Sequence, residues 1–174
     1  FLKLNRAKHV TSVSKILDDT KNLKAKIILE NTSGQGTEMG YRLPEFAELL
    51  EAIRKETNER ERLAVCIDTQ HLFAAGYDLR SKKAVVESVS IIEQEIGWEN
   101  IACVHFNDSK RKVGARVDRH QDIGEGEIGA TGLKAFLGSA SKARKNLPFI
   151  LETPEEHSDF ASQIKKALSW NPKQ

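Results

Sequence analysis

Four short apolar runs in this sequence each end in a side chain that can bind a metal ion. Each run has the length of a β-strand, and its polar end is a carboxylate in three cases and an imidazole in the fourth. Taken singly, such a carboxylate is more often a helix cap or a solvated loop group. The carboxyl ends of neighbouring parallel strands converge, however, and three carboxylates packed together repel one another unless a cation lies between them. These four residues therefore predict a divalent metal site: Glu30, Asp68, His105 and Glu152.

Three more side chains of metal-binding type follow two of these strand ends. His71 comes three residues after Asp68, and Asp118 and His120 flank Arg119. In an extended segment Asp118 and His120 point to the same side, as two ligands of one ion would, and Arg119 points to the other. Alone, this D-x-H pattern is more typical of a surface loop. Mixed imidazole and carboxylate ligands suit Zn²⁺, with Mn²⁺ as the alternative ion.

A basic segment leads up to this D-x-H pair. Residues 108–119 carry five Lys or Arg side chains against two Asp side chains, a local charge of +3. Such a charge run is usually a solvated loop, but beside a metal site it suits a phosphodiester backbone. The residues that we expect to contact DNA are Lys110, Lys112, Arg116 and Arg119.

The candidate ligands need a scaffold that brings strand ends together, and the order of predicted elements provides one. Short apolar runs predict strands, and apolar residues at helical spacing predict helices. A helix followed by four strand–helix units predicts an α/β fold with a parallel sheet and a ligand site at the carboxyl ends of its strands. The predicted strands are 25–30, 63–68, 101–105 and 148–152, and the predicted helices are 6–21, 44–57, 82–96, 130–143 and 158–170.

The length and composition of the chain limit the classes of fold and function to which it can belong. The chain has 174 residues, of which 39% are hydrophobic and 30% charged, as in one globular domain. A net charge of +2 gives no polybasic field over the whole chain. We expect no membrane contact, because no apolar run is long enough to span a bilayer. Cys66 and Cys103 lie in apolar runs and fit a reducing compartment without disulfides.

Five segments of the sequence resemble the endonuclease IV family of apurinic/apyrimidinic (AP) endonucleases. The resemblance implies a TIM barrel, of which residues 1–174 are a single partial domain, the C-terminal four βα units. A complete barrel needs about 200 residues or more. The segments stand in the family's order and cover nearly the whole chain: LENTSGQG (29–36), VCIDTQHLFAAGYD (65–78), VHFNDSK (104–110), ARVDRHQDIGEGEIG (115–129) and FILETP (149–154).

The resemblance implies a DNA repair nuclease with three zinc ions. Such an enzyme acts in base excision repair and hydrolyses the phosphodiester on the 5′ side of an abasic site in double-stranded DNA. Its place would be intracellular: the cytoplasm of a bacterium, or the nucleus or mitochondrion of a eukaryote. Glu30 is implied to bridge two zinc ions and Glu152 to orient the attacking hydroxide, so these two are the expected catalytic residues. The implied metal ligands are Glu30, Asp68, His71, His105, Asp118, His120 and Glu152.

In the family, two further histidine ligands of the first zinc come from strands that would precede Phe1. We therefore expect the isolated chain to be incomplete and a poor catalyst by itself. A half barrel would also expose two sheet edges at which chains can associate, and the sequence leaves the oligomeric state open.

Two other functions remain open from the sequence. One is a metal-dependent sugar isomerase of the same barrel superfamily, which shares a Glu/Asp/His/Glu metal core but needs neither a third metal site nor a basic loop. The other is a non-catalytic fragment that binds metal and DNA weakly.

Overall fold

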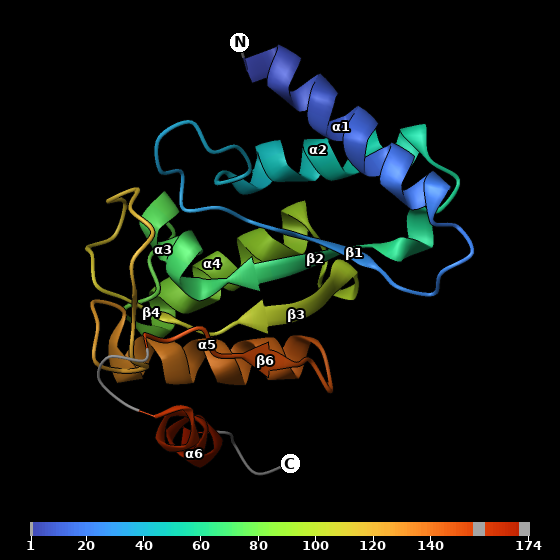
Figure 1. Ribbon diagram of the computed structural model, residues 1–174. Helices are drawn as coiled ribbons and strands as arrows, with labels where there is room; N and C mark the ends of the chain where they lie inside the picture. The colour runs from blue at the N-terminus through green and yellow to red at the C-terminus, as the bar shows by residue number, and fades with distance from the viewer. Residues whose placement is uncertain (1, 155–158, 171–174) are drawn as a thin grey trace.

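The computed structural model describes residues 2–154 and 159–170, and its centre is a parallel β-sheet. Four strands lie in the order β1-β2-β3-β6, and their arrowheads point to the same side of the molecule in Figure 1. This arrangement confirms the predicted α/β class with a parallel sheet. The strands are β1 (Ile27–Glu30), β2 (Leu63–Asp68), β3 (Ile101–His105) and β6 (Phe149–Ile150).

Helices separate the strands along the chain and form a layer around the sheet. Neighbours within this layer contact each other in the order α1, α2, α4, α5, and α4 lies behind the strands in Figure 1. The long helices are α1 (Leu2–Asp19), α2 (Leu43–Glu56), α4 (Lys82–Glu95), α5 (Gly129–Ala143) and α6 (Phe160–Trp170). The smaller elements are helix α3 (Thr69–Ala75), the 3₁₀ turns Arg60–Arg62 and Trp98–Asn100, and the antiparallel pair β4 (Asp108–Ser109) and β5 (His120–Gln121).

The hydrophobic core lies between the sheet and the helices. In β2, Val65 and Ile67 are fully buried and belong to the core together with Phe46 of α2. Cys66 and Asp68 alternate with them along the strand, lie outside this hydrophobic cluster and face the opposite side of the sheet. The sheet therefore has an apolar outer face, covered by helices, and an inner face whose strand ends carry the candidate ligands.

The edge strands are less covered than the sequence predicts. All six residues of β2 are buried, as expected for a strand with apolar residues on both faces. Ile28 in β1 and Ile150 in β6, however, are 44% and 43% exposed. In the part of the chain that the structure describes, each of these strands has a paired neighbour on one side only. Their inner side chains are therefore open to solvent.

Most predicted elements are confirmed, with ends that shift by a few residues. The strand expected at 25–30 pairs only from Ile27, and the strand expected at 148–152 pairs only at Phe149 and Ile150. The first helix begins before the predicted residue 6, and the last begins at Phe160. Residue 158, the predicted start of that last helix, lies outside the described residues. Element ends depend on pairing partners and caps, which periodicity does not record.

The segment after β2 forms a short helix that the sequence does not predict. Helix α3 begins at Thr69, directly after Asp68. The Asp68 carboxylate accepts a hydrogen bond from the backbone N–H of His71 at 2.8 Å and so caps the helix. At seven residues, α3 is too short for apolar periodicity to reveal it.

No helix in the described ranges is long and apolar enough to cross a bilayer.

Candidate metal centre

The carboxyl ends of the four sheet strands converge on one cluster of ligand atoms. Glu30, Asp68 and His105 are the last residues of β1, β2 and β3, and Glu152 lies two residues after β6. One potential ligand atom of each lies within 4.8 Å of those of the others. Asp68 is fully buried, whereas the Glu152 side chain is 42% exposed. The structure thus brings together all four predicted strand-end residues at a site that solvent can reach.

His71, Asp118 and His120 lie next to this cluster. The two carboxylate oxygens of Asp118 approach Nε2 of His71 and Nε2 of His120, each at 3.3 Å. Nε2 of His120 also lies 3.8 Å from Oδ2 of Asp68. The ligand atoms of Asp68, His71 and His120 form a second compact group. Asp68 therefore belongs to both groups, and the seven predicted ligands form one continuous centre.

Both histidines of the second group are held as metal-binding histidines usually are. Nδ1 of His71 lies 2.8 Å from the carbonyl oxygen of Asn31, and Nδ1 of His120 lies 3.0 Å from that of Glu152. Since a carbonyl accepts a hydrogen bond only from a protonated nitrogen, Nδ1 carries a hydrogen, and Nε2 is the nitrogen that can offer a lone pair to a metal ion once it is deprotonated. Both Nε2 atoms are buried without a hydrogen-bond partner in the described part of the chain. Two such nitrogens beside several carboxylates fit a metal ion such as zinc.

Two buried asparagines hold Asp68 in place. The sequence predicts no role for either of them. Oδ1 of Asn31 accepts a hydrogen bond from the backbone N–H of Asp68 at 2.8 Å. Nδ2 of Asn107 donates to Oδ2 of Asp68 at 2.6 Å, while its Oδ1 accepts from the backbone N–H of Glu152 at 2.8 Å. Asn31 follows Glu30 directly, and Asn107 comes two residues after His105. That placement beside predicted ligands is the signal that could have found them.

The charges of the cluster shift several pKa values. Burial raises the pKa of Glu30, but hydrogen bonds from His105 and His71 outweigh burial and lower it to about 2. Burial lowers the pKa of His71, yet the adjacent Asp118 and Glu30 carboxylates outweigh it and raise the pKa to about 11 in the metal-free chain. Burial raises the pKa of Asp68. The carboxylates thus require positive charge nearby, from imidazole protons or from a metal ion.

One buried carboxylate outside the ligand set shapes the segment after His120. Asp108 is fully buried in β4, which pairs with the β5 strand that contains His120. Its carboxylate accepts five backbone hydrogen bonds, at 2.8 to 3.1 Å. These bonds fix the turn between β5 and α5 against β4. The donors are the N–H groups of Ser109, Gly124, Gly126, Ile128 and Gly129.

The predicted DNA-contacting residues lie on the loop between β4 and β5, at the rim of the metal centre. The Arg116 guanidinium lies 4.2 Å from the centroid of the Tyr41 ring, within the range of a cation–π contact. Arg119 stands between the candidate ligands Asp118 and His120 and donates to the carbonyl oxygen of Asp118 at 2.5 Å. All four side chains are exposed: Lys110, Lys112, Arg116 and Arg119.

Comparisons with known proteins agree with this geometry. Residues 4–174 match a protein-family model described as xylose isomerase-like TIM barrel. A probable endonuclease 4 of Buchnera aphidicola is 39% identical over 160 residues, which are 89% of this chain and 54% of that protein. A probable endonuclease 4 of Chloroflexus aggregans is 39% identical over 157 residues, which are 90% of this chain and 53% of that protein. The chain thus spans about half the length of the curated relatives that it matches.

One solved structure is similar to this chain in both fold and sequence. The crystal structure of endonuclease IV from Thermus thermophilus superposes with a TM-score of 0.75 at 33% identity, over 95% of this chain and 57% of that one. These similarities confirm the resemblance to endonuclease IV that the five sequence segments predicted. With a family model that matches nearly its whole length, the chain belongs to the xylose isomerase-like TIM barrel family.

Proposed function

We propose that this chain is the C-terminal half of a metal-dependent AP endonuclease, which hydrolyses the phosphodiester on the 5′ side of an abasic site in double-stranded DNA. The observation that supports this most directly is the pair of ligand groups that share Asp68 at the carboxyl ends of the strands. The similarity to endonuclease 4 proteins supports the choice of substrate. As a half barrel, the chain would need the preceding strands of the protein to complete the site.

The seven ligands divide into two sets by their partners. Glu30, Asp68, His105 and Glu152 would hold one part of the metal centre, and the other part would lie where Nε2 of His71 and His120 face Asp118. Bound Zn²⁺, or Mn²⁺ as the alternative, would stabilise negative charge on phosphate oxygens and lower the pKa of water.

Two glutamates of the chain itself would have separate roles at this centre. The Glu152 backbone is fixed by Asn107, while its carboxylate is 42% exposed and faces His105 at 2.9 Å. Glu152 would therefore orient the attacking water and accept its proton. Glu30, at 3.1 Å from Nδ1 of both His71 and His105, would hold the two parts of the centre together.

The basic loop would bind the DNA backbone. Lys110, Lys112, Arg116 and Arg119 are exposed on the loop between β4 and β5, and their positive charges would attract the phosphates of DNA. Contacts to phosphates carry no sequence information, so these side chains would position DNA of any sequence.

The test is cleavage of a labelled duplex that contains one abasic site, by the full-length protein that carries this sequence and by the chain alone. We expect a single cut on the 5′ side from the full-length protein, with a 3′-hydroxyl that a polymerase can extend. Chelation and Glu152→Gln should each reduce the rate by at least about 100-fold. Cleavage that withstands both changes would contradict the proposal. The chain alone should bind DNA weakly and in a salt-sensitive way, with negligible turnover.

A sugar isomerase of the same family is the competing function. Asp118, His71 and His120 lie together beyond the four strand-end ligands, and an isomerase does not need that group. Measuring bound metal per protein with and without His120→Asn separates the two functions. Loss of metal in the variant supports the nuclease, and unchanged stoichiometry supports the isomerase.

A further inference from the structure

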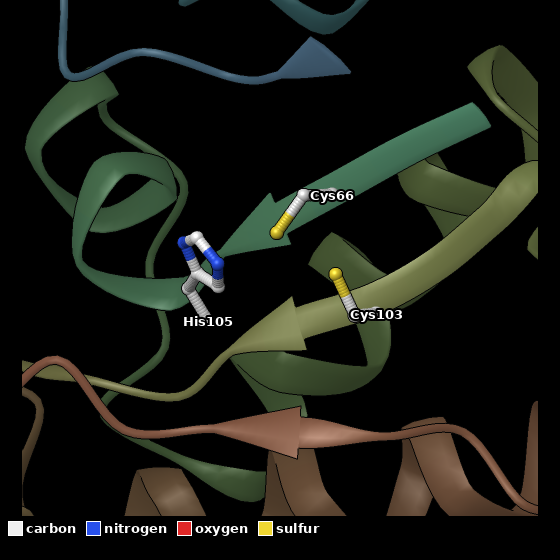
Figure 2. A group of neighbouring side chains, drawn as sticks. All are labelled: Cys66, Cys103 and His105. Carbon is white, nitrogen blue, oxygen red and sulfur yellow. The ribbon is translucent and has the colours of Figure 1, made fainter. Parts of the chain in front are cut away.

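Two cysteines lie on the inner face of the sheet, directly behind the candidate metal centre. Cys66 of β2 and Cys103 of β3 are register partners on neighbouring strands, and both are free thiols. Figure 2 shows their sulfur atoms pointing toward each other between the two strands, with the His105 ring at the strand ends. The two sulfur atoms and a ring nitrogen of His105 all lie within 4.8 Å of one another.

These thiols differ in their surroundings from ordinary buried cysteines. Cys66 and Cys103 are buried, at 3% and 7% exposed, but they lie outside the cluster of apolar side chains between the sheet and the helices. They lie instead on the face that carries Glu30 and Asp68 at its strand ends. The sequence predicts that each fills space as a small apolar side chain, but the structure places both beside an imidazole.

We propose that Cys66, Cys103 and His105 form a separate binding site for a thiophilic divalent ion such as Cd²⁺ or Zn²⁺. Two sulfur ligands and one nitrogen ligand suit such ions, and three protein ligands leave a fourth position for water. Binding releases both thiol protons to solvent. The two thiolate charges then balance the ion, so the filled site is neutral and tolerates burial. Mg²⁺ and Mn²⁺ prefer oxygen ligands and remain at the carboxylates.

His105 links this thiol site to the metal centre described above. Its Nδ1 lies 2.9 Å from Oε2 of Glu152 and 3.1 Å from Oε1 of Glu30. When the His105 ring turns toward the sulfur atoms, its Nδ1 no longer faces the Glu30 and Glu152 carboxylates. Occupation of the thiol site by Cd²⁺ therefore weakens metal binding at the carboxylates, and Cd²⁺ acts as an inhibitor of the centre. This inference concerns ion binding only and does not depend on which reaction the centre catalyses.

The test is a Cd²⁺ titration of the chain followed by thiolate-to-metal charge-transfer absorption in the ultraviolet. The chain contains only two cysteines, so the band reports on Cys66 and Cys103 alone. We expect a band that saturates at one Cd²⁺ per chain. Cys66→Ser and Cys103→Ser should each weaken this binding by at least about tenfold, since the loss of even an outer-shell partner costs that much. In the double variant the band should disappear.

A second measurement tests the shared histidine. The chain is first loaded with Mn²⁺, and free Mn²⁺ is then followed by electron paramagnetic resonance as Cd²⁺ is added. Release of Mn²⁺ from the wild-type chain, and a smaller release from the double cysteine variant, supports the competition. Saturating Cd²⁺ without a charge-transfer band in the wild-type chain overturns the thiol site, whatever the fate of Mn²⁺. That outcome leaves the nuclease proposal untouched, because carboxylate-bound metal is measured separately. The wild-type titration stands even if a variant fails to fold.

Discussion

At the scale of single residues, Asp68 combines a structural role with a candidate ligand role. Its carboxylate caps α3 and receives the Asn107 amide, while its backbone N–H donates to Asn31. The same carboxylate lies among the ligand atoms of both groups of the centre. Burial alone would favour its neutral form, and the capping bond and nearby histidines oppose that effect. Hydrogen bonds from the His71 backbone and from Asn107, together with the nearby histidines, stabilise this buried acid against the repulsion from Glu30.

The first prediction concerns Asn107. Asn107→Ala removes the donor to Asp68 and the acceptor for the Glu152 backbone, and so leaves buried polar groups unpaired. We expect the free energy of unfolding to fall by about 1–3 kcal/mol and zinc affinity to fall by about 10–100-fold, as for other outer-shell partners. Urea unfolding and isothermal titration with zinc measure the two effects.

Asn100→Ala is the matched control. The Asn100 side chain also accepts a hydrogen bond from Arg54 and donates to the Ile96 carbonyl oxygen and the Glu99 carboxylate, but it lies at the opposite end of β3. It should lower stability by a similar amount and leave zinc affinity unchanged. Equal losses of affinity in both variants would show that the effect of Asn107 is only global destabilisation.

At the scale of elements, the segments after β2 and β3 add three candidate ligands to those at the ends of the parallel strands. Helix α3 brings His71 back over the end of β1, where it meets the Asn31 carbonyl oxygen. The β4–β5 pair returns Asp118 and His120 to the same place from far along the chain. The β4–β5 pair has little apolar surface of its own, and hydrogen bonds to Asp108 stabilise the turn that follows it. Helix α3 also packs Leu72 and Phe73 into the core.

The second prediction tests this turn at Gly126. A Cβ atom on Gly126 would overlap the Ser109 carbonyl oxygen and the Asp108 carboxylate. Gly126→Ala should therefore displace the turn, lower the free energy of unfolding by about 2–3 kcal/mol and weaken zinc binding. Thermal unfolding followed by circular dichroism, with a zinc titration, measures both.

Gly138→Ala provides the comparison for Gly126. Gly138 lies within α5, and a Cβ atom there would meet nothing within 4 Å. Because alanine favours the helix more than glycine does, this substitution should stabilise the chain by up to about 1 kcal/mol without any change in zinc affinity. If Gly126→Ala is equally harmless, the close packing around Asp108 is not needed for the site.

The third prediction concerns the basic loop and DNA. Replacing Lys110 and Lys112 by Ala should weaken binding of the chain to an abasic duplex and flatten its salt dependence. Each phosphate contact contributes about 0.9 to the slope of log K against log salt concentration, so the slope should fall by up to about 1.8. Fluorescence anisotropy over a range of salt concentrations measures it. Lys142→Ala, exposed in the last turn of α5, should leave the slope unchanged.

At the scale of the whole molecule, the elements that pack over long stretches could be predicted from the sequence, and the contacts that complete the site could not. Apolar runs located β2 and β3 to the residue because every side chain in β2 is buried and the pattern is unbroken. Helix α3, with seven residues, is too short for apolar periodicity to reveal it, and the β4–β5 pair lies beside a turn held by hydrogen bonds to Asp108 rather than by apolar side chains. The sequence also does not predict the roles of Asn31 and Asn107, since an asparagine next to a strand end resembles any turn residue.

The last prediction follows from the acidic residues that the whole sheet gathers at one end. Without a metal ion, imidazole protons and hydrogen bonds balance the acidic side chains at the strand ends, and a bound cation would add further positive charge there. An ion that binds the folded chain alone stabilises it by about 2.7 kcal/mol at 100 times its dissociation constant, which raises the melting temperature of a chain of this length by roughly 5–10 °C. Chelator-treated protein, scanned with and without added zinc, measures this shift.

Two variants separate this effect from unspecific binding of zinc. Asp118→Asn combined with His120→Asn removes one group of ligands and should abolish much of the shift in melting temperature. His9→Gln alters a histidine on the exposed side of α1 and should keep the shift whole. The stabilisation belongs to the centre because, among the described residues, this ligand set lies at the ends of four separate strands, so that unfolding any strand releases the ion. Identical melting temperatures with zinc and with chelator would show that the gathered side chains do not form a metal centre in the isolated chain.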